Sequence, residues 1–120
     1  MRLQALRGAI TCEENTRAEI EAKTKRLVKE LLDRNGIAHD DLVSVIFTAT
    51  EDLTAEFPAT AARDLGLGDI PLLCARELTI DHGMPMCIRV LVHAYVDRPR
   101  QELHHVYLDG ARSLRDDLPE

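Results

Sequence analysis

The chain has 120 residues, of which 45% are hydrophobic and 30% charged, and these values are typical of one globular domain with a core large enough to fold alone. A net charge of −6 and an aromatic content of 3% argue against nucleic-acid binding, which uses basic residues and stacked rings. No apolar run is long enough to cross a membrane, so we expect no membrane partner. Three cysteines without CxxC spacing favour a reducing cytoplasm over a disulfide framework or a zinc site.

The first predicted elements are a strand over Leu3–Thr11 and a long helix. Gly8, at the middle of the strand, indicates a bulge or the close approach of another backbone. The helix begins after Thr16, which opens a capping box, and ends at Gly36, a residue suited to the left-handed conformation found at helix ends. Two acid–base pairs on the helix have i,i+4 spacing, Glu19 with Lys23 and Glu21 with Lys25.

Five further elements complete the predicted order β-α-β-α-β-β-β. They are a strand over Leu42–Thr50, a short helix over Ala59–Leu65, and extended segments over Ile70–Glu77, Met86–Val96 and His104–Leu108. This order predicts an α+β domain over residues 1–120, with a mixed five-stranded sheet, one long helix, one short helix and a polar tail from about residue 115. Because so few helices cannot cover a whole sheet, we expect an apolar face that an oligomer buries.

Arg89 is the residue that points most directly to function. It lies in Met86–Val96, a segment that is otherwise apolar and β-branched and is therefore predicted to be a central strand. An unpaired buried guanidinium is very costly, so Arg89 needs an anion from the protein or from a ligand. Strand alternation places Arg89 on one face with Cys87, Leu91 and His93.

Glu77 is the candidate partner for Arg89 within the protein. In the simplest interpretation, Glu77 forms a structural salt bridge with Arg89 or with Arg7 of the first strand. Two arginines around one glutamate leave an excess of positive charge, however, and guanidinium groups bind carboxylates in a bidentate manner. The same residues therefore also suit a ligand with two carboxylates. Other basic or hydrogen-bonding candidates are Arg63, Cys74, Tyr107 and Arg115.

Other kinds of site lack their sequence patterns. His104 and His105 are adjacent in a predicted strand and point to opposite faces, so they cannot share one metal ion. The chain has no His-Glu-x-x-His, Ser-His-Asp, GxSxG or glycine-rich phosphate pattern. We therefore expect neither a metal ion nor a cofactor.

Seven short motifs follow one another along the chain. They are Arg7-Gly8-Ala9, Thr50-x-Asp52-Leu53, Phe57-Pro58-Ala59-x-x-x-Arg63, Cys74-x-x-Glu77, Cys87-Ile88-Arg89-Val90, His105-Val106-Tyr107-Leu108 and Leu114-Arg115-x-Asp117-Leu118. In these motifs, from about Leu6 to Leu118, the chain resembles the AroH class of monofunctional chorismate mutase. The resemblance implies a homotrimer built as a pseudo-α/β barrel, with active sites between subunits. It also implies the Claisen rearrangement of chorismate to prephenate, on the route to phenylalanine and tyrosine, without a cofactor.

The resemblance further implies a role for each site residue. Arg89 would lie against the breaking ether oxygen and also reach a carboxylate, while Arg7 would bind the side-chain carboxylate. Glu77 and the Cys74 region would bind the ring hydroxyl, and Tyr107 would donate to a carboxylate. The walls of the pocket would come from Phe57, Ala59, Leu73 and Leu114. The basic residues near its mouth would be Arg63 and Arg115.

Two other functions stay open on sequence grounds. A trimeric imine or enamine deaminase also binds a carboxylate through an arginine at a subunit interface, but it needs one arginine and an activated water. That function does not account for Cys74-x-x-Glu77 together with Cys87-Ile88-Arg89. A small-molecule-sensing domain, the second alternative, would bind the anion without turnover.

Overall fold

The computed structural model describes residues 1–115 and contains one mixed sheet with the strand order β3-β2-β4-β1-β5. The strands are β1 (Arg2–Thr11), β2 (Leu42–Ala49), β3 (Leu72–Arg76), β4 (Cys87–Val96) and β5 (Val106–Leu108). The central strand β4 is antiparallel to β1 and β2, while the outer strands β5 and β3 are parallel to their neighbours. The predicted α+β class and mixed five-stranded sheet are confirmed.

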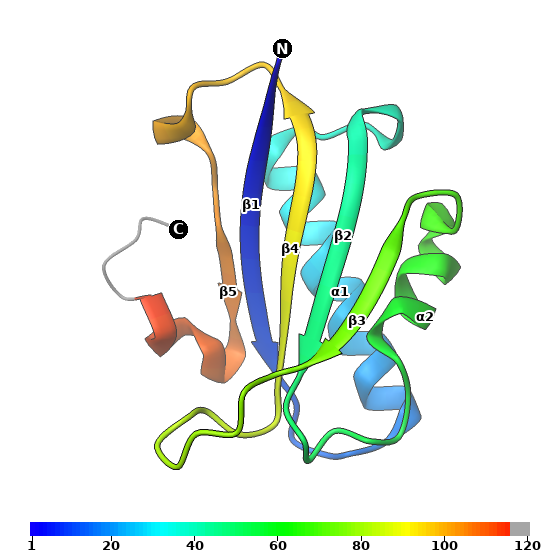
Figure 1. Ribbon diagram of the computed structural model, residues 1–120, viewed down its shortest axis with the longest axis vertical. Helices are drawn as coiled ribbons and strands as arrows, with labels where there is room; N and C mark the ends of the chain where they lie inside the picture. The colour runs from blue at the N-terminus through cyan, green and yellow to red at the C-terminus, as the bar shows by residue number, and fades with distance from the viewer. Residues whose placement is uncertain (116–120) are drawn as a thin grey trace.

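Two α-helices, α1 (Arg17–Asn35) and α2 (Pro58–Ala62), lie on the same face of the sheet, behind it in Figure 1. Short helical turns complete the chain: η1 (His39–Asp41), η2 (Arg63–Leu67), η3 (Arg100–Glu102) and η4 (Asp109–Arg115). The short predicted helix is α2 continued by η2, and Gly66, the predicted end of that helix, lies inside η2 as a kink with a φ of 89° that only glycine adopts readily. η4 was not predicted, because its few apolar residues form no stripe long enough to indicate a helix.

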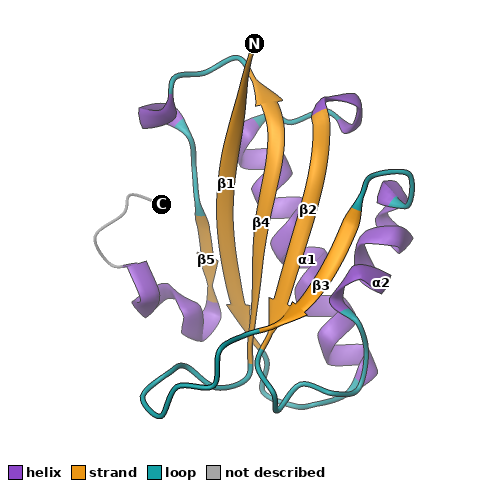
Figure 2. Cartoon of the chain, in the orientation of Figure 1, coloured by secondary structure: helices purple, strands orange, loops and turns teal. Residues whose placement is uncertain are grey.

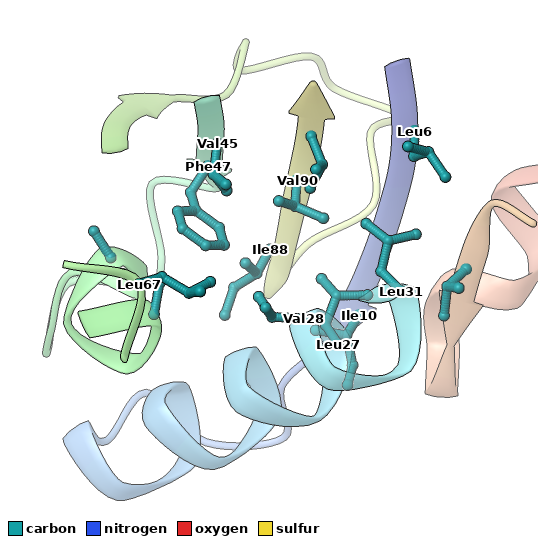
Figure 3. Packing of buried hydrophobic residues seen from close by; sticks show 14 of the residues in the cluster. Leu6, Ile10, Leu27, Val28, Leu31, Val45, Phe47, Leu67, Ile88 and Val90 are labelled. Carbon is teal, nitrogen blue, oxygen red and sulfur yellow. The ribbon is translucent and has the colours of Figure 1, made fainter. Parts of the chain in front are cut away.

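The hydrophobic core lies between the sheet and the two helices. Figure 3 shows Phe47 and Val90 of the sheet and Val28 and Leu31 of α1 meeting in this layer, and each of them is almost completely buried. Burial of one such side chain contributes about 1.5–3 kcal/mol. This layer therefore accounts for most of the energy that fixes the strands relative to α1.

The caps of α1 follow the prediction except for half of the capping box, since the Glu19 carboxylate accepts from the backbone N–H groups of Glu13 and Glu14 rather than from that of Thr16, and the predicted ion pairs do not form. The Thr16 hydroxyl accepts a hydrogen bond from the Glu19 backbone N–H at 3.1 Å, and Gly36 adopts the left-handed conformation. The predicted pairing of Lys23 with Glu19 is wrong: Lys23 contacts Asp109. Lys25 likewise pairs with Asp64 instead of Glu21. An exposed i,i+4 pair contributes only about 0.2–0.5 kcal/mol, so a partner supplied by the tertiary fold displaces it easily.

Gly8 allows two backbones to approach closely. The pairing between β1 and β4 continues through Gly8 without a bulge, and the irregularity in the sheet lies instead between Leu42 and Ser44 of β2. A Cβ atom at Gly8 would lie only 2.9 Å from the carbonyl oxygen of Val106 in β5. Of the two predicted roles for this glycine, close approach is therefore correct, and it is what lets β5 pair beside β1.

Over the second face of the sheet, which we call the open face, lies none of the α-helices of residues 1–115. A small cluster of Ala9, Cys87 and Ala111 places part of η4 against its lower end, with Tyr107 packed alongside. Elsewhere large apolar side chains stay exposed, such as Leu73 at 60%. The predicted uncovered face is present. The largest errors in strand limits are in the fifth strand, which has three residues rather than the five of His104–Leu108, and in the third, which covers only Leu72–Arg76; each of the other three strands differs from its predicted limits by one residue.

Candidate active site

Four of the predicted site residues meet on the open face. Arg7 of β1, Arg89 of β4, Tyr107 of β5 and Glu77, the residue after β3, line one cavity of about 270 Å³. Strand register brings them together, because Ala9 lies opposite Arg89 on one side and Tyr107 on the other. Three strands and the residue after a fourth thus supply one site, and strand alternation directs the side chains of Arg7, Arg89 and Tyr107 to it.

Glu77 is fixed in place beside Arg89. Its Oε2 accepts a hydrogen bond from the Thr48 hydroxyl at 3.0 Å, and its Oε1 accepts one from the Leu78 backbone N–H at 3.0 Å. Arg89 Nε lies 3.1 Å from the same Oε2, as an ion pair whose angle does not meet hydrogen-bond geometry. The structural salt bridge considered from the sequence therefore forms with Arg89, and Glu77 keeps the guanidinium in a fixed position.

The site retains an excess of positive charge. Within residues 1–115, the ion pair with Glu77 is the only salt bridge of Arg89, and Arg7 forms none. The Arg89 side chain is 41% exposed, so its guanidinium is accessible from the cavity. One carboxylate beside two guanidinium groups leaves a site that suits an anionic ligand.

The start of β4 is fixed by a motif whose role could not be read from the sequence. The Thr50 hydroxyl donates to Asp52 at 2.5 Å and accepts from the Cys87 backbone N–H at 3.0 Å. The Asp52 carboxylate also accepts from the Met86 backbone N–H at 3.0 Å. These bonds close the long loop between β3 and β4, shown in Figure 2, two residues before Arg89. Thr50-x-Asp52 thus positions the strand that carries Arg89.

Five other predicted site residues, from the walls, the ring-hydroxyl contact and the mouth of the pocket, do not line this cavity. Phe57, which precedes α2, and Cys74 of β3 line a different cavity of about 670 Å³. Leu73 lies on the open face of β3, and Arg63 is exposed where α2 meets η2. Ala59 is buried in the main core at 4% exposure and is not among the residues that line either cavity. A single copy of the chain therefore separates the Phe57 group from the Arg89 group.

Two predicted residues belong to the C-terminal turn η4. Leu114 packs with Tyr107 against the cluster of Ala9, Cys87 and Ala111, and so lies beside the open-face cavity. The side chain of Arg115 and the predicted polar tail, residues 116–120, lie outside the part of the chain that the structure describes. Thr48, which orients Glu77, was not predicted as a site residue. It lies two residues after Ile46 on β2, and this spacing places both side chains on the open face.

The cysteines near the site are poor nucleophiles. Burial raises the pKa of the Cys87 thiol, and burial with nearby Glu19 raises the pKa of Cys12 to about 11. Within residues 1–115, no group of three histidine, cysteine or acidic side chains could hold a metal ion. None of the helices described has the length and apolar character needed to cross a membrane.

Known proteins resemble this chain both in sequence and in fold. A family model described as chorismate mutase type I matches residues 3–118. The chain belongs to this family. It is 46% identical to chorismate mutase AroH of Thermus thermophilus over 117 residues, which cover 97% of this chain and 96% of that protein. It is 39% identical to chorismate mutase AroH of Bacillus subtilis (strain 168) over 119 residues, which cover 98% and 94%.

A solved structure of similar fold is a chorismate mutase from Clostridium thermocellum. The two structures superpose with a TM-score of 0.90 at 44% sequence identity, covering 92% of this chain and 98% of the other. The resemblance to chorismate mutase predicted from seven motifs is therefore confirmed over nearly the whole chain.

Proposed function

We propose that this chorismate mutase rearranges chorismate to prephenate at the open-face cavity of Arg7, Glu77, Arg89 and Tyr107. Family membership identifies the enzyme as an isomerase of aromatic amino acid biosynthesis. The observation that carries the location of the site is the excess of guanidinium over carboxylate in that cavity. Chorismate has two carboxylates, and Arg7 and Tyr107 suit their binding.

The reaction breaks a carbon–oxygen bond and forms a carbon–carbon bond within one molecule. It therefore needs no nucleophile and no general base, which is consistent with the thiol of Cys87 staying protonated. Negative charge grows on the ether oxygen in the transition state. A preorganised hydrogen-bond donor at this oxygen lowers the activation free energy and raises the rate about 10²–10³-fold. We assign this role to Arg89.

Preorganisation of Arg89 depends on its neighbours. Thr48 and the Leu78 backbone orient Glu77, and Glu77 fixes Arg89 Nε at 3.1 Å. The guanidinium therefore does not have to reorganise as the ether oxygen becomes charged. Glu77 is also placed to accept a hydrogen bond from the ring hydroxyl, while binding of both carboxylates would keep the substrate in its compact, reactive conformation.

We further propose that a neighbouring copy of the chain completes each site, in a homotrimer. The open-face cavity, at about 270 Å³, is smaller than the roughly 300–1,000 Å³ typical of ligand sites. It opens onto an uncovered sheet face, and Phe57 and Cys74 line a separate cavity of the same chain. Contact between subunits would bring the cavity lined by Phe57 in one copy against the cavity lined by Arg89 in another. The two cavities together would then form one substrate site.

The proposed location is the cytoplasm. Cys12, Cys74 and Cys87 are all free thiols, and two of the three are buried. Free thiols without a disulfide are typical of a reducing compartment.

The decisive experiment follows the ultraviolet absorbance of chorismate after addition of the purified protein. We expect absorbance to fall far faster than in buffer, with prephenate formed in equal amount. Light scattering should give three times the chain mass of 13.5 kDa. A rate no faster than buffer would refute the assigned site and reaction, whereas a fully active single chain would refute the shared site alone.

A further inference from the structure

The shortest strand carries one of the proposed substrate contacts. Tyr107 lies at the middle of β5, which pairs with β1 through three residues only. β5 is an edge strand, and parallel pairing is slightly less stable per residue than antiparallel pairing. Three residue pairs with a single neighbouring strand fix the position of this segment only weakly. The position of Tyr107 must therefore be fixed by further contacts.

Helix α1 provides such contacts at the beginning of the segment. The side chain of Asn35, only 1% exposed, donates from Nδ2 to the His104 carbonyl at 2.8 Å. Its Oδ1 accepts from the His104 backbone N–H at 2.7 Å. Asn35 thus makes both hydrogen bonds that an adjacent strand would offer to His104.

The same helix contacts the end of the segment through charge. Arg26 Nη1 lies 3.0 Å and 3.1 Å from the two carboxylate oxygens of Asp109, and Lys23 pairs with the same carboxylate. Hydrogen bonding from Lys23, with a further contribution from Arg26, lowers the pKa of Asp109. The carboxylate is therefore ionised throughout the neutral range.

The contacts at the two ends of the segment are separated by nearly the same length on α1 and on the segment itself. From Lys23 to Asn35 the helix rises about 18 Å, at 1.5 Å per residue. From His104 to Asp109 an extended chain covers about 17 Å, at about 3.3 Å per residue. Since α1 contacts both ends of this length, β5 cannot shift along β1 without breaking one set.

Asp109 is also the residue at which the chain turns from β5 into η4. Its φ is 54°, a left-handed value that Asp and Asn tolerate better than most residues. The next residue, Gly110, donates its backbone N–H to the Thr11 hydroxyl at 2.8 Å. The direction of η4, and with it the placement of Leu114 beside Tyr107, is set at this turn.

We infer that Asp109 is a positioning residue for substrate binding, acting through Tyr107 and η4. The inference rests on the proposed function, because Tyr107 lines the proposed substrate cavity. Arg89 does not depend on Asp109, since Glu77, Thr48 and the Leu78 backbone hold it independently. Loss of the Asp109 charge should therefore weaken substrate binding and leave the chemical step intact.

The test compares Asp109→Asn with the wild-type trimer under steady-state conditions. Asparagine keeps the shape of the side chain and tolerates the left-handed backbone, and it replaces the charged carboxylate by a neutral amide with one acceptor oxygen fewer. We expect KM for chorismate to rise about tenfold while kcat stays within about twofold, as for removal of one charge-assisted interaction. The matched control is Glu30→Gln, which breaks the 2.8 Å pair with Arg34 on the same helix and should leave both constants unchanged.

A second comparison distinguishes the positioning of Tyr107 by Asp109 from a general destabilisation of the fold. If Asp109 acts through Tyr107, the KM effect of Asp109→Asn should shrink in a Tyr107→Phe background, as coupled residues do not act additively. Lys23→Met, which leaves Arg26 in place, should show a smaller effect in the same direction and serves if Asp109→Asn does not fold. Wild-type KM in both variants, or a fall in kcat alone, would overturn the inference. A wild-type protein without turnover would instead refute the proposed function.

Discussion

The two faces of the sheet differ in kind, although the same strands supply both. The covered face consists of apolar side chains such as Phe47 and Ile88, which are completely buried against the helices. The open face has Arg7 and Arg89 in a cavity that polar Thr48 and apolar residues such as Leu91 also line, and both arginines keep solvent exposure. Packing on the first face needs volume and apolar character, whereas the second face needs particular groups at particular positions.

This division means that neighbouring residues of one strand affect different properties. Ile88 and Arg89 are adjacent in β4, yet one contacts the core and the other the proposed substrate. Free energy of unfolding and catalytic rate should therefore change separately, depending on which face a substitution alters.

The largest effect is expected on the covered face. Phe47→Ala should lower the free energy of unfolding by about 3–5 kcal/mol, because it removes a buried ring and leaves a cavity. Urea unfolding followed by circular dichroism measures this change. Val43→Ala, at an exposed position of the same strand, is the control and should stay within about 0.5 kcal/mol. Equal losses in the two variants would contradict the assignment of the core to one face.

The next effect is expected on the open face. Arg89→Ala should lower kcat by about 10²–10³ with little change in unfolding midpoint, because a partly exposed ion pair contributes about 0–1 kcal/mol to stability. Arg89→Lys should also fail, since an ammonium group cannot reproduce the planar fork. Arg34→Ala on α1 is the control in the chorismate assay. Wild-type turnover in Arg89→Ala would show that the charge of Arg89 does not contribute to catalysis.

The smallest effect is expected at the contact of Asp109 in η4 with Lys23 and Arg26 in α1. Lys23 and Arg26 lower the pKa of Asp109, so its stabilising contribution is present above the ordinary carboxyl pKa of about 4 and is lost as pH falls below that value. The stability difference between wild type and Asp109→Asn should therefore be constant from pH 7 to 5 and shrink at pH 3. Urea unfolding at these three pH values measures it. A difference that grows at pH 3 would show the opposite linkage.

The features predicted from the sequence were mainly those fixed by local periodicity. Alternation along β4 placed Arg89 on the face opposite Ile88, and the capping pattern at Thr16 marked the start of α1. Close approach at Gly8 was one of the two roles predicted for a glycine inside a strand, and the other, a bulge, is absent there.

Features that depend on tertiary proximity were not predicted. Lys23 finds Asp109, 86 residues further along the chain, although Glu19 is one helical turn away. Similarly, the sequence could not show that Phe57 and Arg89 line separate cavities of one chain, since both belonged to one predicted pocket. Spacing along the sequence gives the face of a strand, but it does not give the distance between two strands.

The position of β1 in the sheet has a consequence for synthesis of the protein. β1 is made first, yet its neighbours β4 and β5 begin at Cys87 and Val106, so the strand stays unpaired while most of the chain is being made. Pairing between such distant segments is slow, and an unpaired apolar strand readily joins another chain. A nascent chain that stops before Val106 would leave one edge of β1 bare. Translation must therefore reach the end of β5 before this strand is protected from association with other nascent chains.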